Sequence, residues 1–281
     1  MSKNMYRSAR LSGLIAGVLV TLAFSSGTAA AITFTASLNP IKLNAKPGQV
    51  LTTEFRLTSQ PGEPRAQFKV EIQDWWRSED GRQSFYGAAG SLPRSCGRWT
   101  SVNPGEAAIV GGETLVVRLT VSVPVTAEPG GYWCALTVDE VPDPLAATPD
   151  QVAMRFLASL ATGIYVYIDP VERAAKIQSI ELESDEAIVQ VENSGNTPVA
   201  VEGRFEFFRQ GEKEPVAVAV LPRNMLLTTP VATGRFAAVL PAADVLPSGH
   251  YLVRALVDIG LDHYIGVQRE IELRRTETAG R

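Results

Sequence analysis

The chain has 281 residues, of which 45% are apolar and 20% charged, so it is long enough to bury the core of one or two domains. Its formal net charge is −4, and an acidic chain is a poor match for nucleic acid or anionic membranes. Its two Cys and two His, at positions 96, 134, 250 and 263, do not have the close spacing of a His/Cys zinc site. We therefore expect no nucleic-acid partner and no metal.

Residues 1–31 have the three parts of a secretory signal peptide. A basic stretch over residues 3–10 precedes an apolar run over residues 11–24, and Ala29 and Ala31 stand at the −3 and −1 positions of a cleavage site. The apolar run is shorter than the roughly 20 residues that span a bilayer. We predict a cleaved chain that is periplasmic or secreted and has no transmembrane anchor.

From residue 32 on, short runs rich in β-branched and aromatic residues alternate with clusters of Pro, Gly, Asn and Asp. The runs over residues 51–58, 68–75 and 114–123 alternate apolar and polar side chains, which is typical of half-buried strands. The pattern restarts after Pro170 with enough strand-like runs for a second sandwich. The predicted fold is all-β, with two immunoglobulin-like β-sandwich domains in tandem after a cleaved signal peptide.

The predicted boundaries follow from these shifts in pattern. The signal peptide covers residues 1–31, the first sandwich residues 32–169, the second sandwich residues 170–275, and a disordered tail residues 276–281. The first sandwich carries a longer insertion around residues 77–110. We expect the mature chain to be a monomer.

One long segment, Val152–Ile168, decides how the first sandwich ends. Apolar residues at its even positions favour a single strand, although Asp150 also suits the cap of a helix over residues 151–161. As one strand it would extend about 56 Å at roughly 3.3 Å per residue, which is more than one sandwich covers. We expect the excess to form an unpaired edge that binds a strand of a client protein. The client-binding residues expected there are Val152, Met154, Phe156 and Leu160, with Arg155 on the opposite face.

The first half also contains both cysteines and a tryptophan pair. In an exported protein the even number of cysteines favours a disulfide between Cys96 and Cys134, and the alternative is two buried free thiols. Trp75 and Trp76 are adjacent on a predicted strand, so their side chains point to opposite faces. An exposed ring of this pair is a candidate platform for a sugar, unless the insertion covers it.

The sequence contains no motif of a nucleophile elbow, a phosphate-binding loop, a zinc-binding helix or a dinucleotide fold. A triad of Ser248, His250 and Asp258 lacks any elbow or oxyanion context, and surface histidines are the favoured interpretation. We therefore predict no catalytic residue, no cofactor and no enzymatic activity.

Several short sequence segments follow one another along the mature chain in an order that is typical of a known family. The first domain opens with Ser37-Leu38-Asn39-Pro40-Ile41-Lys42-Leu43 and ends with Tyr165-Val166-Tyr167-Ile168-Asp169-Pro170, and the second contains Val191-Glu192-Asn193-Ser194-Gly195-Asn196. This order resembles the PapD-like periplasmic chaperones of pilus assembly. The resemblance implies a non-enzymatic chaperone for a secreted or surface subunit, such as a fimbrial one. In that family a positively charged cleft between the domains anchors the subunit's C-terminal carboxylate, and the last strand of the first domain lends apolar residues to the subunit.

The chain departs from this family at the anchor. The expected Lys is missing from the long strand, where Arg155 is the only cation, and the sequence does not decide whether Lys42 or Arg56 corresponds to the cleft Arg. Residues 129–138, which include Gly131-Tyr132-Trp133, are instead similar to a strand of cell-surface proteins with a peptidoglycan-binding sandwich. That second resemblance implies an alternative function, an envelope module that recognises glycan or a surface protein.

Overall fold

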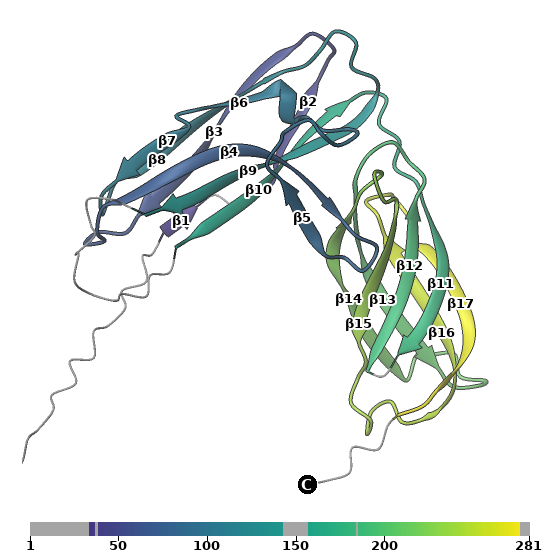
Figure 1. Ribbon diagram of the computed structural model, residues 1–281. Coiled ribbons are helices and arrows are strands. Elements are labelled where there is room, and N and C mark those ends of the chain that lie inside the picture. Colours follow the sequence, from purple (N-terminus) through teal and green to yellow (C-terminus); the bar gives the residue numbers. More distant parts are fainter. Residues whose placement is uncertain (1–33, 37–38, 143–156, 184, 276–281) are drawn as a thin grey trace, which may run out of the picture. The chain divides into compact units, whose positions relative to one another are not determined.

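The computed structural model describes residues 34–36, 39–142, 157–183 and 185–275, and strands dominate this part of the chain (Figure 1). These residues contain no α-helix and one short 3-10 helix, η1 (Gly97–Trp99). The prediction of an all-β chain with two tandem sandwiches is confirmed. The predicted signal peptide and the predicted tail lie outside the described residues.

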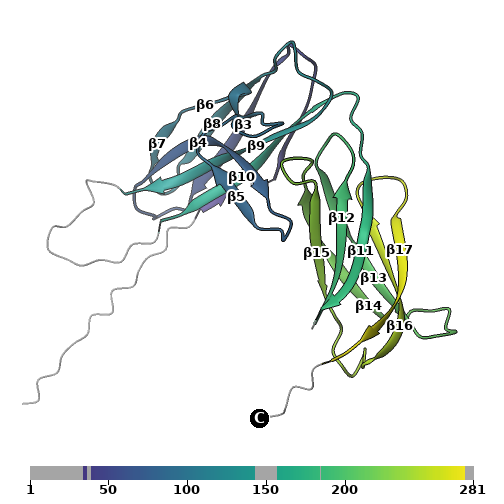
Figure 2. The ribbon, with the colours of Figure 1, turned by 45° about the vertical axis from the view of Figure 1, so that its right-hand side comes forward.

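The N-terminal sandwich consists of two sheets. Its strands are β1 (Phe34–Ala36), β2 (Ile41–Ala45), β3 (Val50–Ser59), β4 (Ala66–Arg77), β5 (Gln83–Tyr86), β6 (Thr100–Asn103), β7 (Glu106–Ile109), β8 (Thr114–Ser122), β9 (Gly130–Val141) and β10 (Ser159–Ile168). One sheet has the order β1-β3-β8-β6, and the other has the order β2-β10-β9-β4-β5, with β7 also paired to β4. Both views show β10 alongside β9 (Figures 1 and 2).

The C-terminal sandwich is simpler. Its strands are β11 (Ala175–Glu183), β12 (Glu186–Asn193), β13 (Val199–Phe208), β14 (Ala217–Leu226), β15 (Thr233–Val239), β16 (Gly249–Asp258) and β17 (Ile265–Leu273). The sheets have the orders β11-β12-β15 and β14-β13-β16-β17, and all strand pairs are antiparallel.

Alternation of apolar residues builds each core. On β8 the residues Leu115, Val117, Leu119 and Val121 are buried while their neighbours face outward. Successive strand residues point to opposite faces, so this period of two places one row of side chains between the sheets. Each large aliphatic or aromatic side chain buried in this way stabilises the fold by about 1.5–3 kcal/mol.

β9 departs from this alternation because nearly all of its side chains are buried. On its inner face Cys134, Leu136 and Val138 belong to the core of the N-terminal sandwich. On its outer face Trp133 and Ala135 join a second cluster, which includes Trp75, Tyr165 and Leu227. The outer face of this sheet is therefore covered by aromatic side chains.

A disulfide and a set of hydrogen bonds to Asp74 hold the insertion of the N-terminal sandwich. The predicted disulfide between Cys96 and Cys134 is present, with 5.4 Å between the two Cα atoms. The carboxylate of Asp74 is buried and accepts backbone N–H bonds from Gly90 at 2.9 Å, Ser91 at 2.6 Å and Leu92 at 2.8 Å. These hydrogen bonds compensate the buried carboxylate and hold the loop over residues 90–92, which belongs to no strand.

The structure corrects the extent of the strand predicted over Val152–Ile168. The strand β10 begins at Ser159, and Leu157 and Ala158 precede it. The N–H of Ala158 donates to the side-chain Oε2 of Glu140 at 3.2 Å, so a carboxylate takes the place of a ladder carbonyl there. The alternative helix over residues 151–161 is likewise wrong for 159–161, whereas residues 151–156 lie outside the described residues.

Candidate binding site at the open edge of β10

The two edges of β10 are paired to different extents. On one side β9 pairs with it along its whole length, from Ser159 opposite Asp139 to Ile168 opposite Gly130. On the other side β2 runs parallel to it and pairs only from Ile164 onward. Along residues 159–163 no described strand pairs with this second side. We call the second side of residues 159–163 the open edge.

The backbone of the open edge presents unpaired polar groups. The N–H of Glu140 donates to the carbonyl of Ala158 at 2.7 Å, so the even-numbered residues that follow exchange bonds with β9. The N–H and C=O groups of Ser159 and Ala161 therefore point away from β9 and have no strand partner among the described residues. Such a row of groups is a template for one more strand.

The open edge carries no charge, no Pro and no bulge, since its residues read Ser159-Leu160-Ala161-Thr162-Gly163. The other edge strands among the described residues are either short or contain features that discourage pairing. β1, β5, β6 and β7 have three or four residues each. Charged residues or Pro stand on the remaining ones: Lys42 on β2, Lys176 and Glu181 on β11, Pro222 and Arg223 on β14, Arg235 on β15, and Arg269 and Glu270 on β17.

The side chains of the open edge divide between the two faces of the sheet. Leu160 and Thr162 point inward, and Leu160 packs partly buried against the core of the N-terminal sandwich. Leu160 pairs with Val138 of β9 on one side and belongs to the open edge on the other, so its contact with a client stays a prediction. Ser159 and Ala161 are exposed on the outer face. The expected client-binding residues Val152, Met154, Arg155 and Phe156 lie outside the described residues.

A cavity of about 560 Å³ adjoins the paired half of β10. Its walls include Lys42 of β2 and Tyr165 of β10, which are register partners, together with Tyr167, Arg173 and Arg223. Arg223 is neutralised by Glu202 at 3.0 Å. Lys42 and Arg173 form no ion pair among the described residues, so these two cations remain available to an anion.

The two tyrosines of this cavity stay protonated near neutral pH. Burial raises the pKa of Tyr165 above its ordinary value, and it also raises the pKa of Tyr167, where Arg173 opposes the effect. Neutral phenols do not compete for the nearby cations. The positive charge of Lys42 and Arg173 is therefore not offset by phenolate.

The structure also decides between the two basic residues that the sequence left unmatched. Lys42 lines the cavity, whereas Arg56 lies on β3 in the opposite sheet and pairs with Glu54 at 2.9 Å. Sequence reasoning did not select Arg173 or Tyr165 for this cavity. The only signal was the pair of tyrosines just before Pro170, which alternation placed on one face.

The tryptophan pair does not present a stacking platform. Trp75 is 4% exposed, and its Nε1–H donates to the carbonyl of Cys134 at 3.3 Å. Trp76 is half-buried, and β5 from the insertion pairs with both residues, placing Phe85 opposite Trp75. Because Trp75 is buried and Trp76 is half-buried, the structure gives no support to glycan recognition by this pair.

The residues of the candidate catalytic triad, Ser248, His250 and Asp258, do not lie together. His250 and Asp258 lie on the same extended strand, β16, which separates them by about 26 Å at roughly 3.3 Å per residue. They cannot form a triad with Ser248. Within the described part of the chain no group of three or more His, Cys, Asp and Glu side chains is placed to hold a metal ion. No helix in that part is long and apolar enough to span a membrane.

No protein-family model matches this chain, and no curated protein matches it. Among solved structures it is similar to the class 5 fimbriae chaperone CfaA, with 13% identity over 84% of this chain and 99% of that chain and a TM-score of 0.48. It is also similar to the CupB2 chaperone of Pseudomonas aeruginosa, with 16% identity over 85% of this chain and 100% of that chain and a TM-score of 0.43. A third is the CsuC–CsuE chaperone–tip adhesion subunit pre-assembly complex of Acinetobacter baumannii, with 16% identity, coverage of 88% and 100%, and a TM-score of 0.46.

Proposed function

We propose that this chain is a periplasmic or secreted chaperone or assembly factor without enzymatic activity, which binds a secreted or surface subunit of fimbrial type. The proposal rests on one observation, the uncharged open edge of β10 over residues 159–163. Natural proteins normally protect such an edge, as the other edge strands of this chain do. An uncharged open edge, in a sheet whose other edge strands are short or carry charge, is suited to pairing with a client strand.

In this mechanism the main-chain hydrogen bonds give affinity and the side chains give specificity for the client. The N–H and C=O groups of Ser159 and Ala161 pair with the client backbone. Val152, Met154 and Phe156, which precede β10, remain proposed apolar contacts of the same client. Arg155 remains a proposed contact for a client carboxylate.

The cavity beside β2 gives the client strand a direction. β2 occupies the edge of β10 from Ile164 onward, so a strand added to the open edge ends where β2 begins. A client C-terminal carboxylate at that point lies beside the cavity that contains Lys42 and Arg173. Charge-assisted bonds to these cations then hold the client parallel to β10.

A proline exchange tests the edge without disturbing the core. Ala161→Pro removes an N–H that faces the open edge and not β9, so we expect stability to stay nearly unchanged. Thr162→Pro is the matched control, because its N–H faces β9 and its loss breaks a ladder bond. The probe is a set of short synthetic peptides of alternating Val and Thr with a free C-terminal carboxylate, and binding is measured by fluorescence polarisation.

The expected result is that the mature wild-type chain binds these peptides and that Ala161→Pro abolishes binding while its thermal midpoint is retained. C-terminal amidation of the peptide should weaken binding to the wild type, because it removes the charge that meets Lys42 and Arg173. Binding that survives Ala161→Pro would overturn edge pairing. The absence of binding by every alternating peptide would overturn the proposed function.

A further inference from the structure

A hollow of about 120 Å³ lies on the outer face of the N-terminal sandwich beside the open edge. Ala161 and Gly163 of β10 and Ala135 of β9 form its floor, and Gly163 and Ala135 are direct cross-strand partners. These three residues have a methyl group or no side chain. The Tyr165 ring lies over Gly163, so the sheet surface is recessed over Ala161 and Ala135, next to the strand that a client would join.

The walls of the hollow are aromatic and polarisable. Trp75 and Tyr165 contact each other edge to face with 6.3 Å between ring centroids, and both line the hollow with Phe85 and Met225. Phe85 remains 42% exposed. The guanidinium of Arg77, a further lining residue, lies 6.0 Å from the Trp75 ring. Aromatic edges, a thioether and a guanidinium all interact favourably with an added aromatic ring.

The hollow has the size of a single ring. A cavity of roughly 150 Å³ accommodates benzene, and this hollow is slightly smaller and open on one side. A side chain attached to a neighbouring strand enters from that open side. The volume therefore suits one Phe or Tyr side chain and leaves no room for a second.

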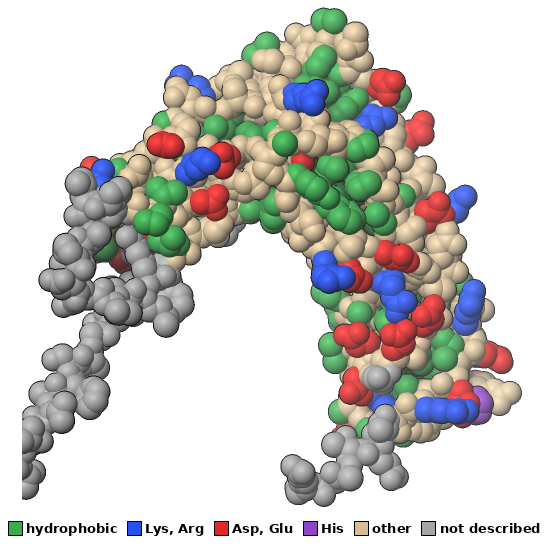
Figure 3. Space-filling view, viewed as in Figure 1, with side chains coloured by type: hydrophobic (Ala, Val, Ile, Leu, Met, Phe, Trp, Pro, Cys, Tyr) green, Lys and Arg blue, Asp and Glu red, His purple; other side chains and the backbone are tan. Residues whose placement is uncertain are grey.

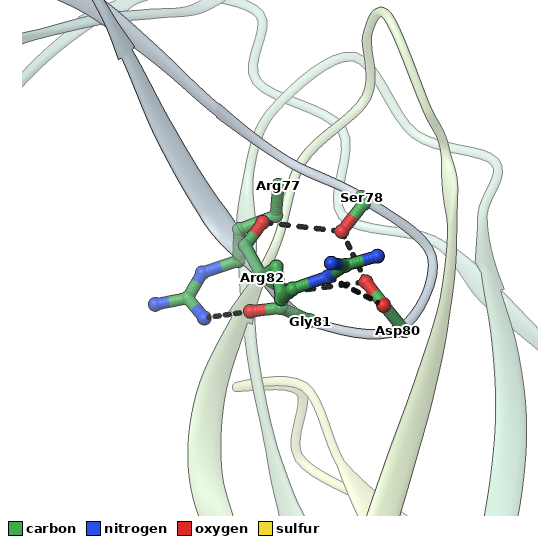
Figure 4. Close-up of polar contacts among 5 residues, drawn as sticks. All are labelled: Arg77, Ser78, Asp80, Gly81 and Arg82. Carbon is green, nitrogen blue, oxygen red and sulfur yellow. Dashed lines mark hydrogen bonds and ion pairs between the residues drawn. The ribbon is translucent and has the colours of Figure 1, made fainter.

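The hairpin that carries Phe85 is fixed before any client binds. Figure 4 shows the turn between β4 and β5, in which Nη1 of Arg77 donates to the carbonyl of Gly81 at 2.8 Å. The hydroxyl of Ser78 donates to the carbonyl of Arg82 at 3.2 Å, and Nε of Arg82 donates to Asp80 at 2.8 Å. A wall held in place in advance reduces the ordering cost of binding.

A strand paired to the open edge would place its outward side chains directly beside the hollow. Cross-strand neighbours have Cβ atoms about 4.5–5.5 Å apart, so an outward client residue opposite Ala161 reaches over its methyl group toward the hollow. We propose that the hollow selects client strands with an aromatic residue at one outward-facing position. This inference rests on the proposed function and specifies which clients the edge accepts.

A second copy of this chain is a poor occupant for the hollow. The outward residues of its own open edge are Ser159, Ala161 and Gly163, none of which supplies a ring. An aromatic residue must therefore come from a different strand. The inference commits to a client strand with alternating side chains and one outward Phe or Tyr.

A size-exchange experiment tests the selection. The probes are alternating Val and Thr peptides with a free carboxylate, in which each position in turn is Ala, Leu or Phe. With wild-type protein we expect Phe at one outward position to bind roughly tenfold or more tightly than Ala at that position, as burial of a large side chain implies. Ala161→Leu fills the hollow and should reduce this Phe-to-Ala ratio to about one. Ala243→Leu, at an exposed alanine far along the chain, should keep the wild-type ratio.

The outcomes separate this inference from the proposed function. Peptides that bind wild type with no preference for Phe, or a ratio that Ala161→Leu leaves unchanged, would overturn selection by the hollow and leave edge pairing intact. A preference for Leu equal to that for Phe would replace an aromatic site with a general apolar one. Failure of all peptides to bind would instead remove the proposed function and this inference with it.

Discussion

The last strands of the two sandwiches, β10 and β17, differ in whether their exposed edges carry charged residues. β17 pairs with β16 along its length, and Arg269 interrupts the inward row of Ile265, Val267 and Ile271 while Glu270 faces outward. The open edge of β10 has no charged residue. An inward-pointing charge is a common protection against edge-to-edge association. The chain therefore carries charge on one exposed edge and none on the other, which is the difference that the proposed pairing with a client strand requires.

The two sandwiches are also stabilised differently. The N-terminal sandwich combines its apolar core with a disulfide and with the buried carboxylate of Asp74. The C-terminal sandwich relies on an aliphatic and phenylalanine core, and in Figure 3 charged side chains of both signs are interspersed over its surface, at lower right. A sandwich with a long insertion and an open edge needs constraints that its neighbour does not. Variants that remove these constraints should affect one sandwich and spare the other.

Loss of the disulfide should have the largest effect. Replacing Cys96 and Cys134 by Ala opens a loop with a sequence separation of 38 residues, and the chain-entropy estimate gives about 4 kcal/mol of lost stability. All four Trp lie in the N-terminal sandwich, so tryptophan fluorescence during denaturant unfolding reports mainly on that sandwich. Hydrogen exchange of β12 and β16 reports the other one and should not change. Equal loss in both sandwiches would show that they unfold as one unit.

Removal of the Asp74 charge should have a smaller effect on the same sandwich. Asp74→Asn keeps the shape of the side chain but turns an acceptor that binds three backbone N–H groups into an amide with donors of its own. We expect the free energy of unfolding to fall by about 2–3 kcal/mol, in the same fluorescence measurement. Asp262→Asn is the control, because that side chain is 96% exposed and should change stability by less than about 0.5 kcal/mol.

Removing the charges of β17 tests the comparison of the two edges with the smallest cost in stability. Arg269→Thr together with Glu270→Thr should shift the unfolding free energy by about 0.5 kcal/mol or less, since both side chains are exposed. The uncharged edge should then cause concentration-dependent association, which sedimentation velocity detects. A variant that remains as monomeric as the wild type would mean that these charges do not protect β17.

Much of the fold was predictable because it depends on local patterns. Alternation over 51–58 and 114–123 predicted strands where β3 and β8 lie, since a period of two is a property of neighbouring residues. The pair Cys96 and Cys134 was predictable from number and compartment alone. The start of β10 was not, because it depends on the Glu140 side chain, which meets Ala158 only after the strands have paired.

By itself, the sequence determined an all-β chain of two tandem sandwiches and the identity of its disulfide partners. Only the tertiary structure decided that Lys42 and not Arg56 lines the cavity, that Trp75 is buried, and that residues 159–163 keep one open edge. Each of these depends on which strand lies beside which, and β2 meets β10 across more than a hundred residues of chain. Alternation fixes which way a side chain points relative to its neighbours, but pairing between distant strands fixes what it meets.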